Sequence, residues 1–220
     1  MTTDRPYRDR RTAGRVLAKE SALTRLEEDV LVLALPRGGV PVADEIASAL
    51  HAPMDVFLVR KLGLPSQPEL AMGAIASGGV RLFNVELLES AGVSPEEFAA
   101  VVERETRELE RREELYRRGR PPLDISGRSI VVVDDGLATG FTMRAAVAAL
   151  RRAGCRNITV AVPVGARSTC AEIAEEVETL VCPLQPEPFH AVGLWYDNFT
   201  PTEDHEVCEC LARHTHHPAA

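Results

Sequence analysis

The chain has 220 residues, of which 45% are hydrophobic and 26% are charged, and its formal net charge at pH 7 is −8. This length allows one α/β domain with a sizeable core and leaves little room for a second full domain. The negative charge gives no overall attraction to polyanions, which argues against nucleic acid or an acidic membrane as a partner. A phosphorylated small molecule remains allowed, because local backbone dipoles or a metal ion can bind it.

The amino-terminal residues include arginines but no apolar stretch of the signal-peptide kind, and the sequence has no run of about 18 apolar residues. We therefore expect a cytoplasmic protein. The five cysteines, an odd number without a CxxC pair, fit reduced thiols better than a disulfide framework. A zinc site near the carboxyl terminus is disfavoured because the spacing of its candidate ligands matches no standard site. Those candidates are His205, Cys208, Cys210, His214, His216 and His217.

In chain order, the pattern predicts an amino-terminal helix over Ala13 to Leu26, followed by short apolar runs rich in Val, Ile and Leu. Such runs, separated by glycines and Ala-rich helical stretches, are typical of buried parallel strands with crossover helices. We expect one α/β domain over residues 1–220. The predicted strands are Val30 to Leu35, Asp55 to Val59, Ile130 to Val133, Ile158 to Pro163 and Glu178 to Cys182, and the helices between them are Val40 to Leu50, Thr142 to Ala153 and Thr169 to Glu176.

Between the second and third predicted strands lies a longer excursion, residues 62–127. Its first part has the Pro and Gly content of a loop and a small hairpin. Its second part, about residues 94–119, predicts a helix with Ser94 as N-cap, Pro95 at the first position, Glu97 completing a capping box and Gly119 beyond the end. We assign this helical insert no chemistry. Its apolar residues lie roughly on one stripe: Phe98, Val101, Val102, Leu109 and Tyr116.

The sharpest motif begins where the third predicted strand ends. Ile130 to Val133 run into Asp134 and Asp135, then a short Gly, Ala and Thr loop, then a helix that opens at Thr142. At the carboxyl end of a parallel strand this arrangement forms a ligand crevice. Backbone N–H groups, the hydroxyls of Thr139 and Thr142 and the positive end of the helix suit a phosphate. Two adjacent acids suit sugar hydroxyls, directly or through magnesium. A nucleotide P-loop is excluded because GxxxxGK[ST] is absent.

Residues 134–142, DDGLATGFT, closely resemble the phosphoribosyl pyrophosphate (PRPP) motif of type I phosphoribosyltransferases: two acids, three variable positions, then Thr-Gly-x-Thr. The resemblance implies a parallel-sheet, Rossmann-like core with a small hood and a helical insert. It implies Mg²⁺ as cofactor, with Asp134 and Asp135 holding the ribose 2′- and 3′-hydroxyls and contacting the metal directly or through water. It assigns the 5′-phosphate to the residues that follow the acids: Gly136, Leu137, Ala138, Thr139, Gly140 and Thr142.

The same resemblance identifies a second loop, Leu35-Pro36-Arg37-Gly38-Gly39, directly after the first predicted strand. In the family this loop binds the pyrophosphate of PRPP through N–H groups, often with a non-proline cis peptide. We expect that peptide between Arg37 and Gly38. The alternative is an ordinary Gly-rich turn before a helix.

A third feature is the basic pair Arg60-Lys61, which leads into a Pro- and Gly-rich stretch over residues 62–73. In the family a mobile loop here closes over PRPP and excludes water. Arg60 and Lys61 would then give positive charge to the pyrophosphate leaving group and act as catalytic residues with Asp134 and Asp135. Outside this context, two basic residues after a strand are more often a solvated edge.

Residues 183–210 correspond to the family's hood over the nucleobase. Phe189, Trp195, Tyr196 and Asp197 are the candidate base-binding residues, although core packing explains an aromatic cluster equally well. In 6-oxopurine enzymes an aspartate stands where this chain has Ala138, so hypoxanthine and guanine are doubtful acceptors. The pattern is closer to a little-characterised group of bacterial predicted phosphoribosyltransferases.

The resulting hypothesis is an enzyme that transfers the 5-phosphoribosyl group from PRPP to a nucleobase-like or other nitrogen acceptor and releases pyrophosphate. A homodimer is a family expectation, with the helical insert as a candidate interface. The alternatives are a non-catalytic PRPP sensor or regulator, and an assembly module that keeps the motif without a ligand. A regulator usually brings a nucleic-acid-binding surface, and the sequence has no basic face or helix-turn-helix extension to provide one.

Overall fold

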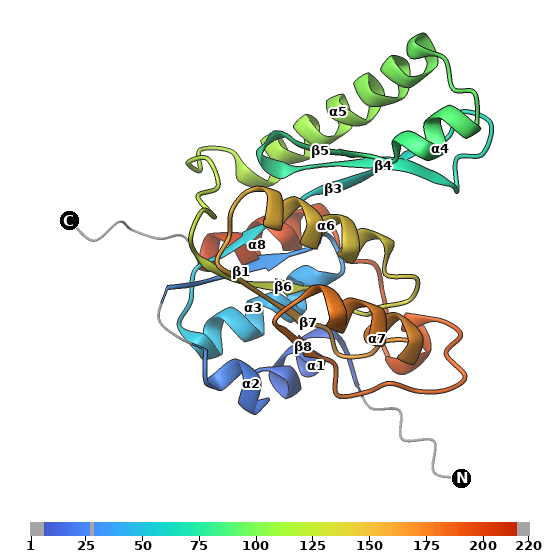
Figure 1. Ribbon diagram of the computed structural model, residues 1–220. Coiled ribbons are helices and arrows are strands. Elements are labelled where there is room, and N and C mark those ends of the chain that lie inside the picture. The colour runs from blue at the N-terminus through green and yellow to red at the C-terminus, as the bar shows by residue number, and fades with distance from the viewer. Residues whose placement is uncertain (1–6, 27–28, 215–220) are drawn as a thin grey trace.

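The fold is built on a five-stranded parallel sheet of order β2-β1-β6-β7-β8 (Figure 1). The computed structural model describes residues 7–26 and 29–214. The sheet confirms the predicted α/β class, and each strand overlaps a predicted one. The strands are β1 Val30–Ala34, β2 Met54–Val56, β6 Ser129–Val133, β7 Asn157–Ala161 and β8 Thr179–Val181.

Both faces of this sheet are covered by helices, which is why β1 and β6 are buried at every position and consist almost entirely of apolar residues. Successive side chains of a strand point to opposite faces. Val32 and Val131 accordingly pack in one buried cluster with α1, α3 and α8, while Leu33 and Val132 pack in another with α6 and α7. The helices are α1 Arg10–Leu17, α3 Gly39–Leu50, α6 Phe141–Arg152, α7 Arg167–Glu176 and α8 Asp204–Arg213.

The strand order places a topological switch point between β1 and β6. The chain leaves β1 through α3 to reach β2 on one side, and it leaves β6 through α6 to reach β7 on the other. In open parallel sheets the crevice outside the carboxyl ends of two such strands is the usual place for a ligand. Here that crevice lies between the loop after β1, residues 35–39, and the loop after β6, residues 134–140.

The excursion between β2 and β6 forms an arm that projects from the five-stranded sheet (cyan to green in Figure 1). It contains an antiparallel sheet of order β3-β4-β5 and two helices. The long helix is the predicted capped helix: the Ser94 hydroxyl accepts a hydrogen bond from the Glu97 N–H at 3.2 Å, and the Glu97 carboxylate accepts one from the Ser94 N–H. The elements are β3 Val59–Gly63, β4 Ala71–Ala76, β5 Val80–Phe83, α4 Val85–Ser90 and α5 Pro95–Arg117, with a short 3-10 turn at Ser77–Gly79.

The predicted strand Asp55 to Val59 spans two strands of different sheets. β2 ends at Val56, and β3 begins at Val59 in the arm. Between them the Phe57 N–H still bonds the carbonyl of β1, at Ala34, whereas the Leu58 N–H turns to the Ser77 hydroxyl of the arm. Because Phe57 and Leu58 are both buried, the apolar run in the sequence gives no sign of the break.

The predicted helix Ala13 to Leu26 is two helices, α1 and the short α2, Ser21–Thr24. α1 begins earlier than predicted because Asp9 caps it, accepting a hydrogen bond from the Thr12 N–H at 2.7 Å. After α1, the N–H groups of Lys19 and Glu20 donate hydrogen bonds to the carbonyls three residues earlier, as in a 3-10 turn. No helix in the described ranges is both long and apolar enough to cross a lipid bilayer.

Candidate active site

Two partly buried carboxylates, those of Asp134 and Asp135, stand at the carboxyl end of β6. Asp134 Oδ1 accepts the backbone N–H of Asp135 at 2.8 Å, and Asp135 Oδ2 accepts Arg10 Nε at 2.8 Å. Burial raises the pKa of Asp134 well above its usual range, and the nearby charge of Asp135 raises it further. Burial also raises the pKa of Asp135, against the opposing charge of Arg10. The other oxygen of each carboxylate, Asp134 Oδ2 and Asp135 Oδ1, accepts no hydrogen bond from another described residue. These two oxygens are therefore available to a ligand.

The loop after β1 lies directly against this acidic pair, and glycine makes the contact possible. A Cβ atom on Gly38 would stand 2.1 Å from Asp135 Oδ2, and one on Gly39 would stand 2.5 Å from the carbonyl oxygen of Val133. The structure therefore brings together the two loops that the sequence predicted separately. The cis peptide of this loop joins Pro36 and Arg37, one bond earlier than the Arg37–Gly38 position we expected.

Arg37 itself reaches across to α8. Its Nη1 lies 3.6 Å from Asp204 Oδ1, and its side chain is 41% exposed. The same carboxylate accepts the hydroxyl of Tyr116, at the end of α5, at 2.5 Å. Burial, with that bond to Asp204, raises the pKa of Tyr116 to about 12. Arg37 is thus a partly exposed cation at the rim of the crevice.

Leu137 anchors the loop after Asp135 to the segment that follows β7. Its side chain is buried, its N–H donates to the Val164 carbonyl at 2.8 Å, and its own carbonyl accepts the Ala166 N–H at 2.8 Å. Leu137, which the resemblance placed among the phosphate-binding residues, holds the loop in place and has no N–H left for a ligand. Both backbone groups of Leu137 thus tie the loop to the segment after β7.

The rest of this loop turns its carbonyl groups inward. Thr169 Oγ1 donates to the Ala138 carbonyl at 2.7 Å, and Arg144 Nη2 donates to the Thr139 carbonyl at 2.9 Å. Gly140, at φ 73°, begins α6 without a side-chain cap. No acceptor among the described residues takes the N–H groups of residues 138–142. Several N–H groups gathered at an uncapped helix amino terminus form an anion-binding site.

The hood packs onto the start of this loop. A Cβ on Gly136 would stand 2.4 Å from Val192, and the Tyr196 hydroxyl donates to the Asp135 carbonyl at 2.6 Å. The Tyr196 ring is buried between those of Tyr7 and Phe199, with centroids 5.6 and 5.1 Å away. Desolvation by burial raises the pKa of Tyr196. Tyr7 and Phe199 therefore cover the Tyr196 ring, which leaves no room for a base to stack on it.

The other candidate base-binding residues are more accessible. Phe189 and Trp195 are half-buried, and Asp197 is exposed. The indole Nε1 of Trp195 is buried without a hydrogen-bond partner among the described residues. The backbone N–H groups of Asp197 and Asn198 bond the carbonyls of residues 7 and 8, so the amino-terminal segment forms one side of the hood.

The basic pair of β3 is engaged by acidic side chains of the arm. Arg60 donates through Nη2 and Nε to Glu105 Oε2 of α5, at 2.6 and 3.0 Å, and Lys61 Nζ lies 3.2 Å from Glu69 Oε2. The Glu105 side chain is 11% exposed. The helix to which the sequence assigned no chemistry therefore supplies the partner of Arg60.

Four residues of this region were missed by the sequence reasoning: Tyr7, Arg10, Glu105 and Thr169. Arg10 lies 125 residues from its partner Asp135 in the chain, and the others also act across long separations or on backbone groups. The one local signal is the capping residue Asp9, which marks where α1 begins and so where Arg10 lies.

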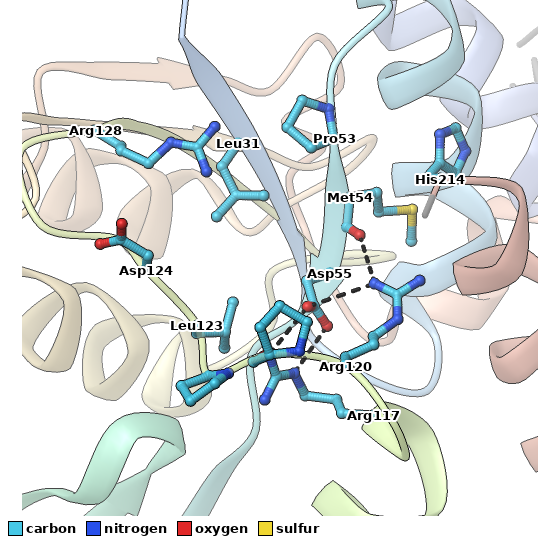
Figure 2. A pocket seen from close by; sticks show the side chains of 12 residues that line it. Leu31, Pro53, Met54, Asp55, Arg117, Arg120, Leu123, Asp124, Arg128 and His214 are labelled. Atoms are coloured by element: carbon cyan, nitrogen blue, oxygen red, sulfur yellow. Dashed lines mark hydrogen bonds and ion pairs between the residues drawn. The ribbon is translucent and has the colours of Figure 1, made fainter. Parts of the chain in front are cut away.

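A separate pocket lies at the opposite edge of the sheet, near the amino ends of β1, β2 and β6 (Figure 2). Its most prominent feature is Asp55, which pairs with Arg117 at 3.1 Å and Arg120 at 3.5 Å. Arg120 also donates to the Met54 carbonyl. These bonds tie the end of α5 to β2, and we assign the pocket no chemistry.

The acidic pair fits a magnesium ion. Two adjacent, partly buried carboxylates disfavour each other's ionisation, and a divalent cation relieves this repulsion. Their oxygen atoms are the donors that Mg²⁺ prefers, and Mg²⁺ commonly takes one or two carboxylates together with phosphate oxygens and water. Within residues 7–26 and 29–214, no group of three His, Cys, Asp or Glu side chains is placed to hold a metal ion alone. Of the zinc candidates, His216 and His217 lie outside the described residues.

The profile of the phosphoribosyl transferase domain matches residues 11–191. Proteins from two strains of Mycobacterium tuberculosis, provisionally named phosphoribosyl transferases, are 46% identical to this chain over 208 residues, which is 94% of this chain and 46% of each relative. The chain thus spans about half the length of these curated relatives. The crystal structure of TT1426 from Thermus thermophilus is 38% identical, with a TM-score of 0.85, and the match covers 96% of this chain and 99% of that one.

Proposed function

The chain belongs to the phosphoribosyl transferase family, and we propose that it transfers the 5-phosphoribosyl group of PRPP to a nitrogen acceptor and releases pyrophosphate. The observation that carries this proposal is the row of N–H groups at residues 138–142, which have no acceptor in the described part of the chain and stand beside two partly buried carboxylates. A phosphate and a polyhydroxylated group joined in one ligand would satisfy both features.

Each part of the crevice takes a role in this proposal. The N–H groups of residues 138–142, with the Thr139 and Thr142 hydroxyls, bind the 5′-phosphate at the positive end of α6. Asp134 and Asp135 accept hydrogen bonds from the ribose 2′- and 3′-hydroxyls. Residues 37 and 38 bind the diphosphate through backbone N–H groups, with the Arg37 side chain at the rim. The Gly39 N–H is engaged by the Leu35 carbonyl, and this residue instead allows the close approach to β6. Asp134 and Asp135 would hold magnesium, which would supply positive charge that stabilises the leaving group.

The reaction breaks the bond between C1 of the ribose and the pyrophosphate oxygen, while the acceptor nitrogen attacks from the opposite face. The sugar passes through an oxocarbenium-like state, so stabilising charge matters more than a covalent nucleophile. Arg60 and Lys61 contribute cationic charge toward the departing pyrophosphate when the 62–73 segment closes. For this contribution, Arg60 must break its hydrogen bonds to Glu105 and bind the pyrophosphate in their place.

The acceptor is bound under the hood, by Phe189, Trp195 and Asp197. Tyr196, also predicted there, is buried between Tyr7 and Phe199 and instead holds the Asp135 carbonyl. Ala138 leaves the site without the loop carboxylate that 6-oxopurine enzymes use, so we favour another nitrogen acceptor. Transfer to a nucleobase would give the enzyme a role in nucleotide salvage. A cytoplasmic homodimer that uses the arm as its interface completes the proposal.

The decisive experiment measures pyrophosphate release from PRPP and Mg²⁺ against a panel of nucleobases and amines, together with PRPP binding by calorimetry. Release with one acceptor class supports the transferase. Tight PRPP binding without release for any acceptor favours the sensor alternative. Absence of PRPP binding refutes both.

Asp135→Asn is the first variant to test. Loss of a charged hydrogen-bond partner is worth about 1.5–3 kcal/mol, so PRPP affinity should fall roughly 10- to 150-fold. Asp124→Asn, an exposed carboxylate in the pocket at the opposite edge of the sheet, is the matched control and should bind PRPP like the wild type. Equal affinity of Asp135→Asn and wild type would remove Asp135 from the site.

A further inference from the structure

Arg10 is a buried cation whose contacts all lie in the candidate site or the hood. Its side chain is only 10% exposed. Nε donates to Asp135 Oδ2 at 2.8 Å, Nη1 donates to the Thr200 carbonyl at 2.8 Å, and the guanidinium carbon lies 3.8 Å from the ring centre of Phe199. A buried charge is costly unless it is paired and hydrogen-bonded, so this set of partners explains why Arg10 is tolerated inside the protein.

The bond to Asp135 selects which carboxylate oxygen faces a ligand. Oδ2 lies between Arg10 and the backbone of Gly38, where even a methyl group on the glycine would collide with it. Oδ1 receives no hydrogen bond from another described residue. Arg10 therefore holds one oxygen against the loop after β1 and leaves the other for the crevice.

Through Nη1 the same guanidinium reaches the hood. Phe199 and Thr200 lie three and four residues after Tyr196 of the hood, and Tyr196 itself bonds the Asp135 carbonyl. The planar guanidinium makes two directed hydrogen bonds and a stacking contact together, which a lysine ammonium does not reproduce. The acidic pair and the hood are thus joined by one side chain from α1.

We propose that Arg10 is a positioning residue of the PRPP site, which fixes the Asp135 carboxylate for the ribose hydroxyls and couples it to the hood. This inference rests on the proposed PRPP-binding function. Arg10 acts through Asp135 and does not itself contact the donor.

The test compares binding of PRPP with Mg²⁺ to wild type, Arg10→Met and Arg10→Lys by calorimetry, with a thermal melt of each ligand-free protein. Groups that orient a ligating side chain typically change affinity about 10- to 100-fold when replaced, so Arg10→Met should lose affinity in that range. Arg10→Lys, which keeps the charge but not the planar contacts, should recover part of it. Arg15→Gln is the matched control, since Arg15 pairs with Glu45 on the exposed side of the same helix.

A double-mutant cycle separates positioning from a general structural effect. In an Asp135→Asn background, Arg10→Met should cause no further loss of PRPP affinity, because the carboxylate that Arg10 orients is gone. Additive losses would overturn the proposal, as would wild-type affinity in Arg10→Met. If Arg10→Met does not fold, Arg10→Lys decides, and full wild-type affinity in that variant would overturn the proposal. A wild-type protein that does not bind PRPP removes the proposed function and this inference with it, whereas a normal wild type with an unaffected Arg10 variant removes the inference alone.

Discussion

Replacing Gly38 with alanine places a methyl group where the Asp135 carboxylate now lies. The backbone of Gly38, at φ −59° and ψ −37°, accepts alanine without strain, so the effect comes from contact alone. The new Cβ would stand 2.1 Å from Asp135 Oδ2 and 2.6 Å from Cγ. Since Cβ atoms essentially never come within 3.0 Å of another atom, the oxygen must move by about 0.9 Å, which disturbs its 2.8 Å bond to Arg10.

This displacement sets the expected magnitudes. Overpacking costs about 1–3 kcal/mol, and the lower chain entropy of alanine in the unfolded state returns about 0.4–1 kcal/mol. The midpoints of these ranges give a net loss of about 1.3 kcal/mol in the free energy of unfolding. A misplacement of about 1 Å in a binding group costs roughly 100-fold in function. We therefore expect Gly38→Ala to bind PRPP about 10- to 100-fold more weakly.

The assay is urea unfolding of Gly38→Ala with and without Asp135→Ala. Truncation of Asp135 removes both of the nearest colliding atoms, so the stability cost of Gly38→Ala should disappear in that background. Gly39→Ala is the matched control, because its Cβ would stand 2.5 Å from the Val133 carbonyl oxygen, a main-chain atom that Asp135→Ala leaves in place. Strict additivity of Gly38→Ala and Asp135→Ala, or equal relief of both glycine variants, would refute the packing argument.

Two further predictions concern ion pairs outside the crevice. Burial raises the pKa of Asp44, but its hydrogen bonds, first of all that from Arg213, lower the pKa by more. The net result is a pKa of about 2, against an ordinary value of 3.8. The folded pKa is the lower one, so this stabilisation, about 2 kcal/mol, is present above pH 4 and is lost as the pH falls toward 2. Acid unfolding of Asp44→Asn should show a flatter profile in that window, and an unchanged slope contradicts the assignment. Glu105→Gln leaves Arg60 without its anionic partner and should cost about 1–3 kcal/mol in urea unfolding, a range reduced from that of fully buried pairs because Arg60 is 28% exposed. Glu103→Gln, at a 64% exposed side chain of the same helix, should stay within about 0.5 kcal/mol of wild type, and equal losses in the two variants would refute the role of the Arg60 pair.

Much of the fold could be predicted from the sequence, because the sequence patterns that specify these elements are local. The apolar runs at residues 30–34 and 130–133 predicted buried parallel strands, and the capping box at Ser94 and Glu97 predicted where α5 begins. The motif at residues 134–142 indicated the phosphoribosyl transferase family, which the comparisons confirmed. Strand, loop and helix follow one another directly there, so the pattern needs no knowledge of distant contacts.

The failures have equally physical causes. In the predicted strand Asp55 to Val59, residues 56–59 are all apolar, and only hydrogen bonding to β1 on one side and to the arm on the other divides them at residues 57 and 58. Leu137 was expected among the phosphate-binding residues, but pairing with the carbonyl of Val164 turned its N–H away from the crevice. In both cases the deciding partner lies elsewhere in the chain.

The sequence by itself determined the α/β class, the family and the chemical types gathered in the loops after β1 and β6. Only the tertiary structure decided which groups face one another: Asp135 against Gly38, Arg10 on that carboxylate, and Glu105 on Arg60. Propensity and periodicity act over a few residues, whereas these contacts join positions 45 to 125 residues apart. The strand order of the parallel sheet brings Asp135 against Gly38, whereas the packing of α1 and of α5 brings Arg10 and Glu105 to their partners.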